Sequence, residues 1–253
     1  MQARRTVSKV PEVTPGFWII KILATTLGET GGDAVSMSMQ LGYLLSTGIF
    51  ALVFVVAVTL QIRATRFHPL LYWTTIIATT TVGTTLADFA DRSLGIGYAG
   101  GASLLLAMLL ASLFAWYRTL GSIAVDSIGS PGSEAFYWAT IMFSQTLGTA
   151  LGDWTADSMG LGYMGAALVF GALIAFAAMA YAWTRVSHTL LFWVAFVLTR
   201  PLGAVVGDLL DKPVSHGGLA LDRFSASAVL LGLILLCIAY THRRQGRLPP
   251  NRH

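Results

Sequence analysis

The sequence predicts an all-α integral membrane protein with eight transmembrane helices. They are expected to form four helical hairpin repeats of parallel orientation around a pseudo-symmetry axis along the membrane normal. Two observations predict this class. Hydrophobic residues make up 55% of the 253 residues, charged residues make up 11%, and the mean hydropathy is +0.68, whereas a soluble domain carries roughly 25% charged residues. In addition, one spaced motif occurs four times along the chain.

The repeated motif is a Trp, a Gly ten residues later, an Asp five residues after that, and a second Gly nine residues further on. The four Trp are Trp18, Trp73, Trp138 and Trp193, and the four motif aspartates are Asp33, Asp88, Asp153 and Asp208. An aromatic residue precedes every Trp. The copies start 55, 65 and 55 residues apart, which indicates two pairs of tandem repeats.

Eight stretches are long and apolar enough to span a membrane, which takes about 20 residues per helix. They cover residues 16–37, 41–62, 70–91, 97–117, 135–157, 161–184, 188–210 and 225–241. The expected organisation is an N-terminal segment at 1–15, repeats at 16–62 and 63–117, a Gly- and Ser-rich linker at 118–134, repeats at 135–184 and 185–241, and a basic, poorly ordered tail at 242–253.

The basic residues predict the orientation. Eleven Lys and Arg fall in the segments at one end of the predicted helices, whereas Arg92, Lys212 and Arg223 fall at the other end. Because loops rich in Lys and Arg stay in the cytoplasm, both termini are expected to be cytoplasmic and to lie against the lipid bilayer, without a nucleic-acid partner. The sequence has no phosphate-binding loop, His-Glu-x-x-His motif or nucleophile elbow, so no enzymatic activity is expected.

The motif aspartates are the candidate functional residues. Each follows its Trp by 15 residues, about 22 Å along a helix, so the four are expected to form a ring in the outer third of the membrane. Further acids lie about one helical turn from this ring, and a Thr recurs two residues before the Gly in three copies. These residues are Glu29, Asp91, Asp157 and Asp211, and the pathway residues Thr26, Thr81 and Thr146.

Carboxylate oxygens suit hard cations such as manganese, calcium and magnesium, and rings of acids select cations in pores. The sequence therefore predicts a site for a divalent cation or a proton, with the four motif aspartates as metal ligands. The alternative is structural: each Asp caps a helix or binds the turn that follows.

Two basic residues interrupt the repeat and are expected to form a gate or charge pair. Lys21 stands where the other copies have Ile or Phe, and Arg200 stands where they have Thr or Gln. We hypothesise that Arg200 pairs with Glu29 across the bundle. The alternatives are a static ion pair for Arg200 and, for Lys21, a side chain that reaches back to the cytoplasmic interface. Pro201 is expected to kink its helix.

The segment from Phe17 to Asp33 and the matching segments of the other three repeats resemble bacterial integral membrane proteins labelled uncharacterised membrane-anchored proteins. This family is built from four tandem two-span repeats of unknown function with a characteristic Trp. The resemblance implies the fold and a bacterial inner-membrane location, but no activity. From the residues we predict a cation transporter for a divalent metal such as manganese. The alternatives are a non-transporting scaffold or sensor partner, and an intramembrane binding protein for a lipid-soluble ligand.

Overall fold

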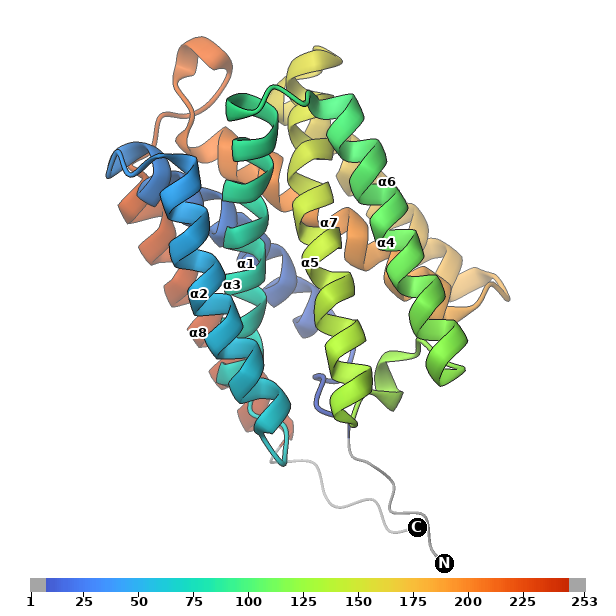
Figure 1. Ribbon diagram of the computed structural model, residues 1–253. Coiled ribbons are helices and arrows are strands. Elements are labelled where there is room, and N and C mark those ends of the chain that lie inside the picture. The colour runs from blue at the N-terminus through green and yellow to red at the C-terminus, as the bar shows by residue number, and fades with distance from the viewer. Residues whose placement is uncertain (1–7, 246–253) are drawn as a thin grey trace, which may run out of the picture.

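The computed structural model describes residues 8–245, which form eight long α-helices joined by short turns (Figure 1). The helices are α1 (Pro15–Asp33), α2 (Gly42–Arg63), α3 (Pro69–Asp88), α4 (Tyr98–Leu120), α5 (Pro131–Asp153), α6 (Gly162–Trp183), α7 (His188–Asp211) and α8 (Arg223–Gln245). Three π-helical turns follow the motif Asp of the first three repeats: η1 (Ala34–Ser38), η2 (Phe89–Ser93) and η4 (Trp154–Ser158). Each predicted span therefore coincides with one long helix.

Proline and capping residues fix where the helices begin. Pro15, Pro69 and Pro131 occupy the first turns of α1, α3 and α5, where the missing N–H costs no hydrogen bond. Before α8, the Asp222 carboxylate accepts hydrogen bonds from the Ser225 backbone N–H and hydroxyl, both at 2.8 Å. The backbone hydrogen bond lowers the pKa of Asp222.

Two expected boundaries differ in the structure. The linker predicted at 118–134 is shorter, because α4 continues to Leu120 and α5 begins at Pro131, with a short 3-10 turn, η3 (Val125–Ser127), between them. The fourth repeat has no π-helical turn. Its α7 runs through Pro201 to Asp211 and is followed by the 3-10 turn η5 (Val214–His216). Helix α8 takes up the start of the predicted tail, and residues 246–253 lie outside the described part.

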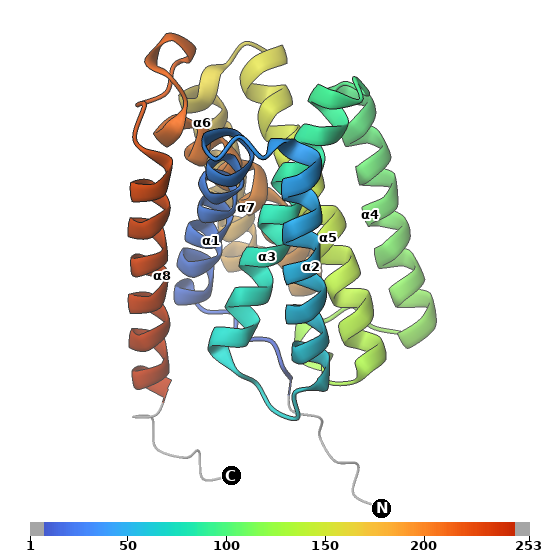
Figure 2. The same ribbon diagram turned by 60° about the vertical axis from the view of Figure 1, so that its left-hand side comes forward.

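The helices form an inner and an outer ring (Figures 1 and 2). Helices α1, α3, α5 and α7 pack side by side in that order, and α7 packs back against α1. All four run from the end where α1 begins and α8 ends, which we call the basal end, to the end that carries the π-helical turns, which we call the acidic end. The four repeats therefore share one orientation around a central axis, as the sequence predicts.

The outer helices do not pack as simple hairpins. Helix α2 packs on α3, α4 on α5, α6 on α7 and α8 on α1, whereas the two helices of one repeat make few contacts with each other. The prediction that the two helices of each repeat pack together as a hairpin is therefore wrong. The second helix of each repeat packs instead on the first helix of the next repeat, and α8 packs on α1. This exchange ties neighbouring repeats together and closes the ring through α8 and α1.

The outer ring presents an apolar surface. Large hydrophobic side chains such as Leu52, Leu168 and Leu236 are 67–69% exposed, while hydroxyl, amide and charged side chains of the inner helices are buried. Helices α2, α4, α6, α7 and α8 are long and apolar enough to cross a membrane. Since burying polar groups and exposing apolar ones is unfavourable in water, the distribution identifies a membrane protein.

The motif glycines allow the inner helices to approach closely. A methyl group added at Gly28 would overlap Thr80, one at Gly148 would overlap Arg200, and one at Gly203 would overlap Thr25. At Gly83 it would lie 2.9 Å from the Gln145 backbone carbonyl carbon. A second small residue follows each motif glycine by four positions: Gly32, Ala87, Gly152 and Gly207. This small-xxx-small spacing is typical of close helix packing in membranes, and it repeats around the ring.

The aromatic pairs close the basal end in the same cyclic order. The aromatic residue of each repeat contacts the Trp of the next repeat or, at the closure, of the first. The four pairs are Phe17–Trp73, Tyr72–Trp138, Tyr137–Trp193 and Phe192–Trp18, with ring centroids 5.5, 5.7, 6.2 and 5.7 Å apart. These rings pack on one another, so they form an aromatic core at this end.

The two tyrosines of this core provide a stability test. Their hydroxyls lie 2.6 Å apart and are buried, and the first and fourth copies have Phe at this position. We expect Tyr72→Phe to destabilise the protein by about 1–3 kcal/mol because the Tyr137 hydroxyl loses its partner. The double change with Tyr137→Phe should recover most of this loss in equilibrium unfolding measurements. A double variant less stable than either single variant would contradict a stabilising hydrogen bond between the Tyr72 and Tyr137 hydroxyls.

Candidate functional site

Five layers of side chains lie along the axis of the inner ring. Each layer takes one residue from each inner helix, and successive layers are four residues apart, or about 6 Å, on one helix face. From the basal end they are the aromatic layer (Phe17, Tyr72, Tyr137, Phe192), the lysine layer (Lys21, Ile76, Ile141, Phe196), the arginine layer (Thr25, Thr80, Gln145, Arg200), the glutamate layer (Glu29, Thr84, Thr149, Ala204) and the aspartate layer (Asp33, Asp88, Asp153, Asp208). No member is more than 8% exposed.

Arg200 connects the two central layers. Its Nη2, with two N–H groups to donate, lies within hydrogen-bond distance of three acceptors: Glu29 Oε2 at 2.9 Å, Thr84 Oγ1 at 2.6 Å and Thr149 Oγ1 at 2.5 Å. One guanidinium nitrogen of α7 thus contacts all three other inner helices. The hypothesis that Arg200 pairs with Glu29 is confirmed as a contact, and both side chains are buried.

Thr84 and Thr149 were missed as axial residues by sequence reasoning. A usable signal was present, because the position after each motif glycine is occupied by Glu29, Thr84 and Thr149 in the first three copies. The predicted pathway residues Thr26, Thr81 and Thr146 are not part of the layers. Each donates its hydroxyl hydrogen bond to a carbonyl of its own helix four residues earlier, and that bond satisfies the donor locally.

The aspartate layer is held together by basic residues from the acidic end. Lys212 forms ion pairs with both Asp33 and Asp208, the latter at 3.1 Å. Arg92 bridges Asp88 at 2.8 Å and Asp153 at 3.4 Å. The structure therefore brings the four motif aspartates into one ring, as predicted, and places two cations in it.

The partners of this ring were also missed at the level of sequence. Arg92 and Lys212 each follow a motif Asp by four residues, which is the offset of an ion pair on a helix. Their positions in the predicted loops indicate only charges that set the orientation. Their side chains instead turn back toward the axis, so the aspartates share two bridging cations.

The second tier of acids divides into two groups. Asp211 joins the ring: it is 6% exposed, pairs with Arg223 at 2.9 Å, and has a carboxylate oxygen within 4.8 Å of those of Asp33 and Asp208. Asp157 is exposed and accepts only a long hydrogen bond from Tyr98, at 3.5 Å. Asp91 is partly exposed and lies beside α4, next to Gly101. Only one of the three second-tier acids is thus part of the buried cluster.

The buried acids outnumber their basic partners. The acidic cluster comprises six carboxylates, from Glu29, Asp33, Asp88, Asp153, Asp208 and Asp211. Among residues 8–245, four bases pair with it: Arg92, Arg200, Lys212 and Arg223. With all groups ionised, two negative charges remain, which corresponds to one divalent cation or two protons. Carboxylate oxygens of Glu29, Asp33 and Asp88 also lie within 4.8 Å of one another, so a second trio has the spacing to hold an ion. Asp153 belongs to neither trio.

Lys21 is fully buried and lies one layer toward the basal end from Arg200, away from the acidic cluster. Its ammonium lies 4.2 Å from the centroid of the Phe196 ring and has no hydrogen-bond partner in the described part of the chain. The interpretation that Lys21 reaches the membrane interface is therefore wrong, because the neighbouring inner helix covers its side chain.

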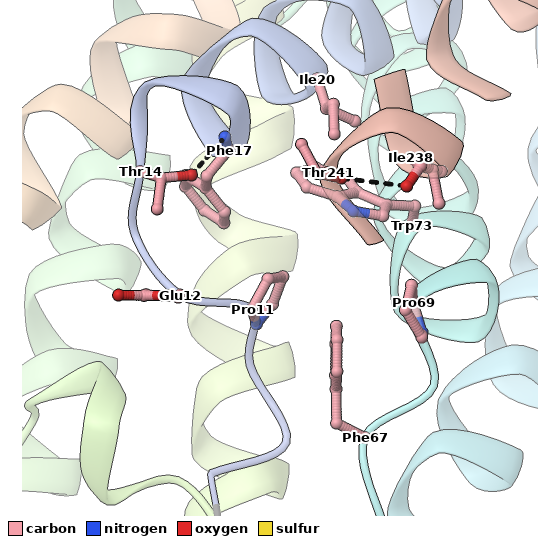
Figure 3. Close-up of a pocket in the computed structure, with 10 residues that line it drawn as sticks. All are labelled: Pro11, Glu12, Thr14, Phe17, Ile20, Phe67, Pro69, Trp73, Ile238 and Thr241. Atoms are coloured by element: carbon pink, nitrogen blue, oxygen red, sulfur yellow. Dashed lines mark hydrogen bonds between the residues drawn. The ribbon is translucent and has the colours of Figure 1, made fainter. Parts of the chain in front are cut away.

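A small pocket opens at the basal end, between α1, α3 and α8 (Figure 3). Its inner wall includes Phe17 and Trp73, which also belong to the aromatic packing at this end. Glu12 and Thr14 supply polar groups at its rim. The aromatic rings thus separate this pocket from the polar layers further along the axis.

The fold and the axial layers define a class: an all-helical membrane protein whose four tandem repeats enclose a buried column of ionisable side chains. The sequence matches the family described as Repeat of Unknown Function (DUF347) four times, over residues 16–67, 71–122, 136–187 and 191–247. The chain belongs to this family, as the four Trp-containing repeats predicted. No curated protein and no solved structure matches it.

Proposed function

We propose that the protein is a cation transporter of the bacterial inner membrane, with a divalent metal such as manganese as the expected substrate. In this proposal all eight helices span the membrane and both termini are cytoplasmic, so the acidic end faces outward. The observation that carries it is the pair of unmatched negative charges in the buried acidic cluster. A cluster that only held the helices together would be more stable with equal numbers of acids and bases.

The composition of the cluster favours a hard cation. Its potential ligands are carboxylate oxygens, with the hydroxyls of Thr84 and Thr149 one layer below. Oxygen ligands of this kind suit manganese, magnesium and calcium. Proton transfer is the related alternative, since two protons would neutralise the same excess charge. Lys212 and Arg92 occupy part of the ring, so entry of a divalent ion requires these side chains to move.

The paired aspartates also support a second candidate, a membrane scaffold or sensor partner. Lys212 and Arg92 together contact all four motif aspartates, which a purely structural role would explain. One feature favours transport over it, namely the two negative charges that remain in the acidic cluster when all of its groups are ionised.

Uptake by proteoliposomes tests the proposal. We expect the wild-type protein to carry manganese, calcium or protons down an imposed gradient. Asp33→Asn or Asp208→Asn should lower the rate at least about tenfold, equivalent to about 1.4 kcal/mol of lost ion stabilisation. Asp126→Asn, which changes an exposed acid at the basal end, is the matched control and should leave the rate unchanged.

Two outcomes would count against transport. One is the absence of flux for all three ions under either gradient direction, with protein that remains folded by circular dichroism. The other is a flux that both aspartate variants retain at the wild-type rate. The scaffold candidate would then be favoured.

A further inference from the structure

A group of polar atoms in the lysine and arginine layers has no hydrogen-bond partner among residues 8–245. The group consists of Lys21 Nζ, Thr80 Oγ1, both side-chain amide atoms of Gln145, and Nε and Nη1 of Arg200. These four residues come from the four different inner helices, and each is 0% exposed. Buried polar groups normally have hydrogen-bond partners, so a concentration of unsatisfied groups in two adjacent layers requires a cause.

The geometry separates this group from the acidic cluster. Arg200 uses Nη2 for Glu29, Thr84 and Thr149 in the glutamate layer, which leaves Nε and Nη1 without a partner. Lys21 lies one layer toward the basal end, against Phe196, the residue one turn before Arg200 on α7. The unsatisfied donors of the two cations are therefore distinct from the Nη2 group that contacts the glutamate layer.

The charges in this region do not balance. When Lys21 is protonated, Lys21 and Arg200 bring two positive charges, and Glu29, the one carboxylate paired with them in the described part of the chain, lies in the layer beyond Arg200. An unpaired buried ammonium costs several kcal/mol. Water molecules would satisfy the hydrogen bonds but would leave this charge, whereas an anion would satisfy both.

The repeat shows that folding alone does not require these cations. The position of Lys21 is Ile in the second and third copies, and the position of Arg200 is Thr or Gln in the other three. The inner helices pack around these uncharged residues in the lysine and arginine layers. Both cations are departures from the repeat, and they fall on neighbouring layers of one axis.

We propose that these unsatisfied polar atoms of the lysine and arginine layers bind one small inorganic anion, with chloride as the representative. The ammonium of Lys21 and the Nε and Nη1 groups of Arg200 supply the charge, while the Gln145 amide and the Thr80 hydroxyl donate further hydrogen bonds. The bound anion makes the group of Lys21, Arg200 and Glu29 electrically neutral. This site stands independently of cation transport, because it uses none of the aspartates.

Halide-dependent stability of the purified full chain in lipid nanodiscs tests the site. Sodium gluconate would be replaced by sodium chloride or bromide at constant ionic strength. We expect the unfolding midpoint of the wild type to rise saturably by at least about 3 °C, because a ligand that binds only the folded state stabilises it. Lys21→Ile, which restores the residue of the second and third copies, should abolish this rise.

Two control variants separate a site from a general salt effect. Lys9→Met removes another buried lysine, one that is paired with Glu134 at 2.5 Å, and should keep the full chloride dependence. Lys21→Arg keeps the positive charge and should therefore keep at least part of the chloride dependence. Line broadening of the chloride-35 NMR signal, measured on the wild type and Lys21→Arg, gives a second readout that does not require Lys21→Ile to fold.

The proposal is overturned if the wild type shows neither a halide-dependent midpoint nor chloride-35 broadening. It is also overturned if Lys21→Ile responds to chloride as strongly as the wild type does. A rise of equal size in all variants, including Lys21→Ile, would identify general screening by salt.

Discussion

Replacing Arg200 by Gln, the residue of the third copy, is expected to destabilise the protein by about 3–5 kcal/mol. The loss follows because Glu29 would remain buried without its cation, and Thr84 and Thr149 would lose their shared donor. Equilibrium unfolding in mixed detergent micelles, in gluconate so that no halide contributes, measures the effect.

The double variant separates the ion pair from general packing. Glu29→Thr installs the residue found at this position in the second and third copies, and when it is combined with Arg200→Gln it removes both charges. We expect the double variant to recover most of the stability that Arg200→Gln loses. If the two losses are instead additive, the residues are not energetically coupled, and the gate hypothesis loses its basis.

Gly203→Ala is expected to destabilise the protein by about 3 kcal/mol, the upper end of the usual range for overpacking. The added methyl group would overlap the Thr25 side chain and approach its backbone carbonyl carbon to 2.8 Å. Because backbone atoms cannot rotate away as a long side chain can, α1 and α7 must separate. Such a separation would disturb every layer that the two helices share.

Gly171→Ala on α6 is the matched control for this change. It lies in a membrane-facing helix, and no atom lies within 4 Å of the added methyl group. We expect it to be neutral or to stabilise the protein by up to about 1 kcal/mol, since Ala favours the helix more than Gly does. Equal effects of the two changes would show that helix propensity, not close packing, explains the motif glycine.

The number of helices, their positions and the class of protein were predictable from the sequence. Apolar stretches of about 20 residues mark helices that cross a membrane, and the Trp–Gly–Asp spacing identified four copies of one unit. The Arg200–Glu29 pair was predictable for a related reason. Each of the two residues departs from the repeat, at positions four residues apart along the motif, so their side chains fall on adjacent layers of a symmetric ring.

The sequence by itself thus determined which residues of one inner helix share a face, because helical periodicity fixes their spacing. Only the tertiary structure decided what that face meets. It placed α2 on α3 rather than on α1, turned Arg92 and Lys212 into the aspartate ring, and left Thr26 bonded to its own helix. The physical reason is that periodicity describes a single helix, whereas a contact also depends on the neighbouring helix and on how closely glycine lets the two approach.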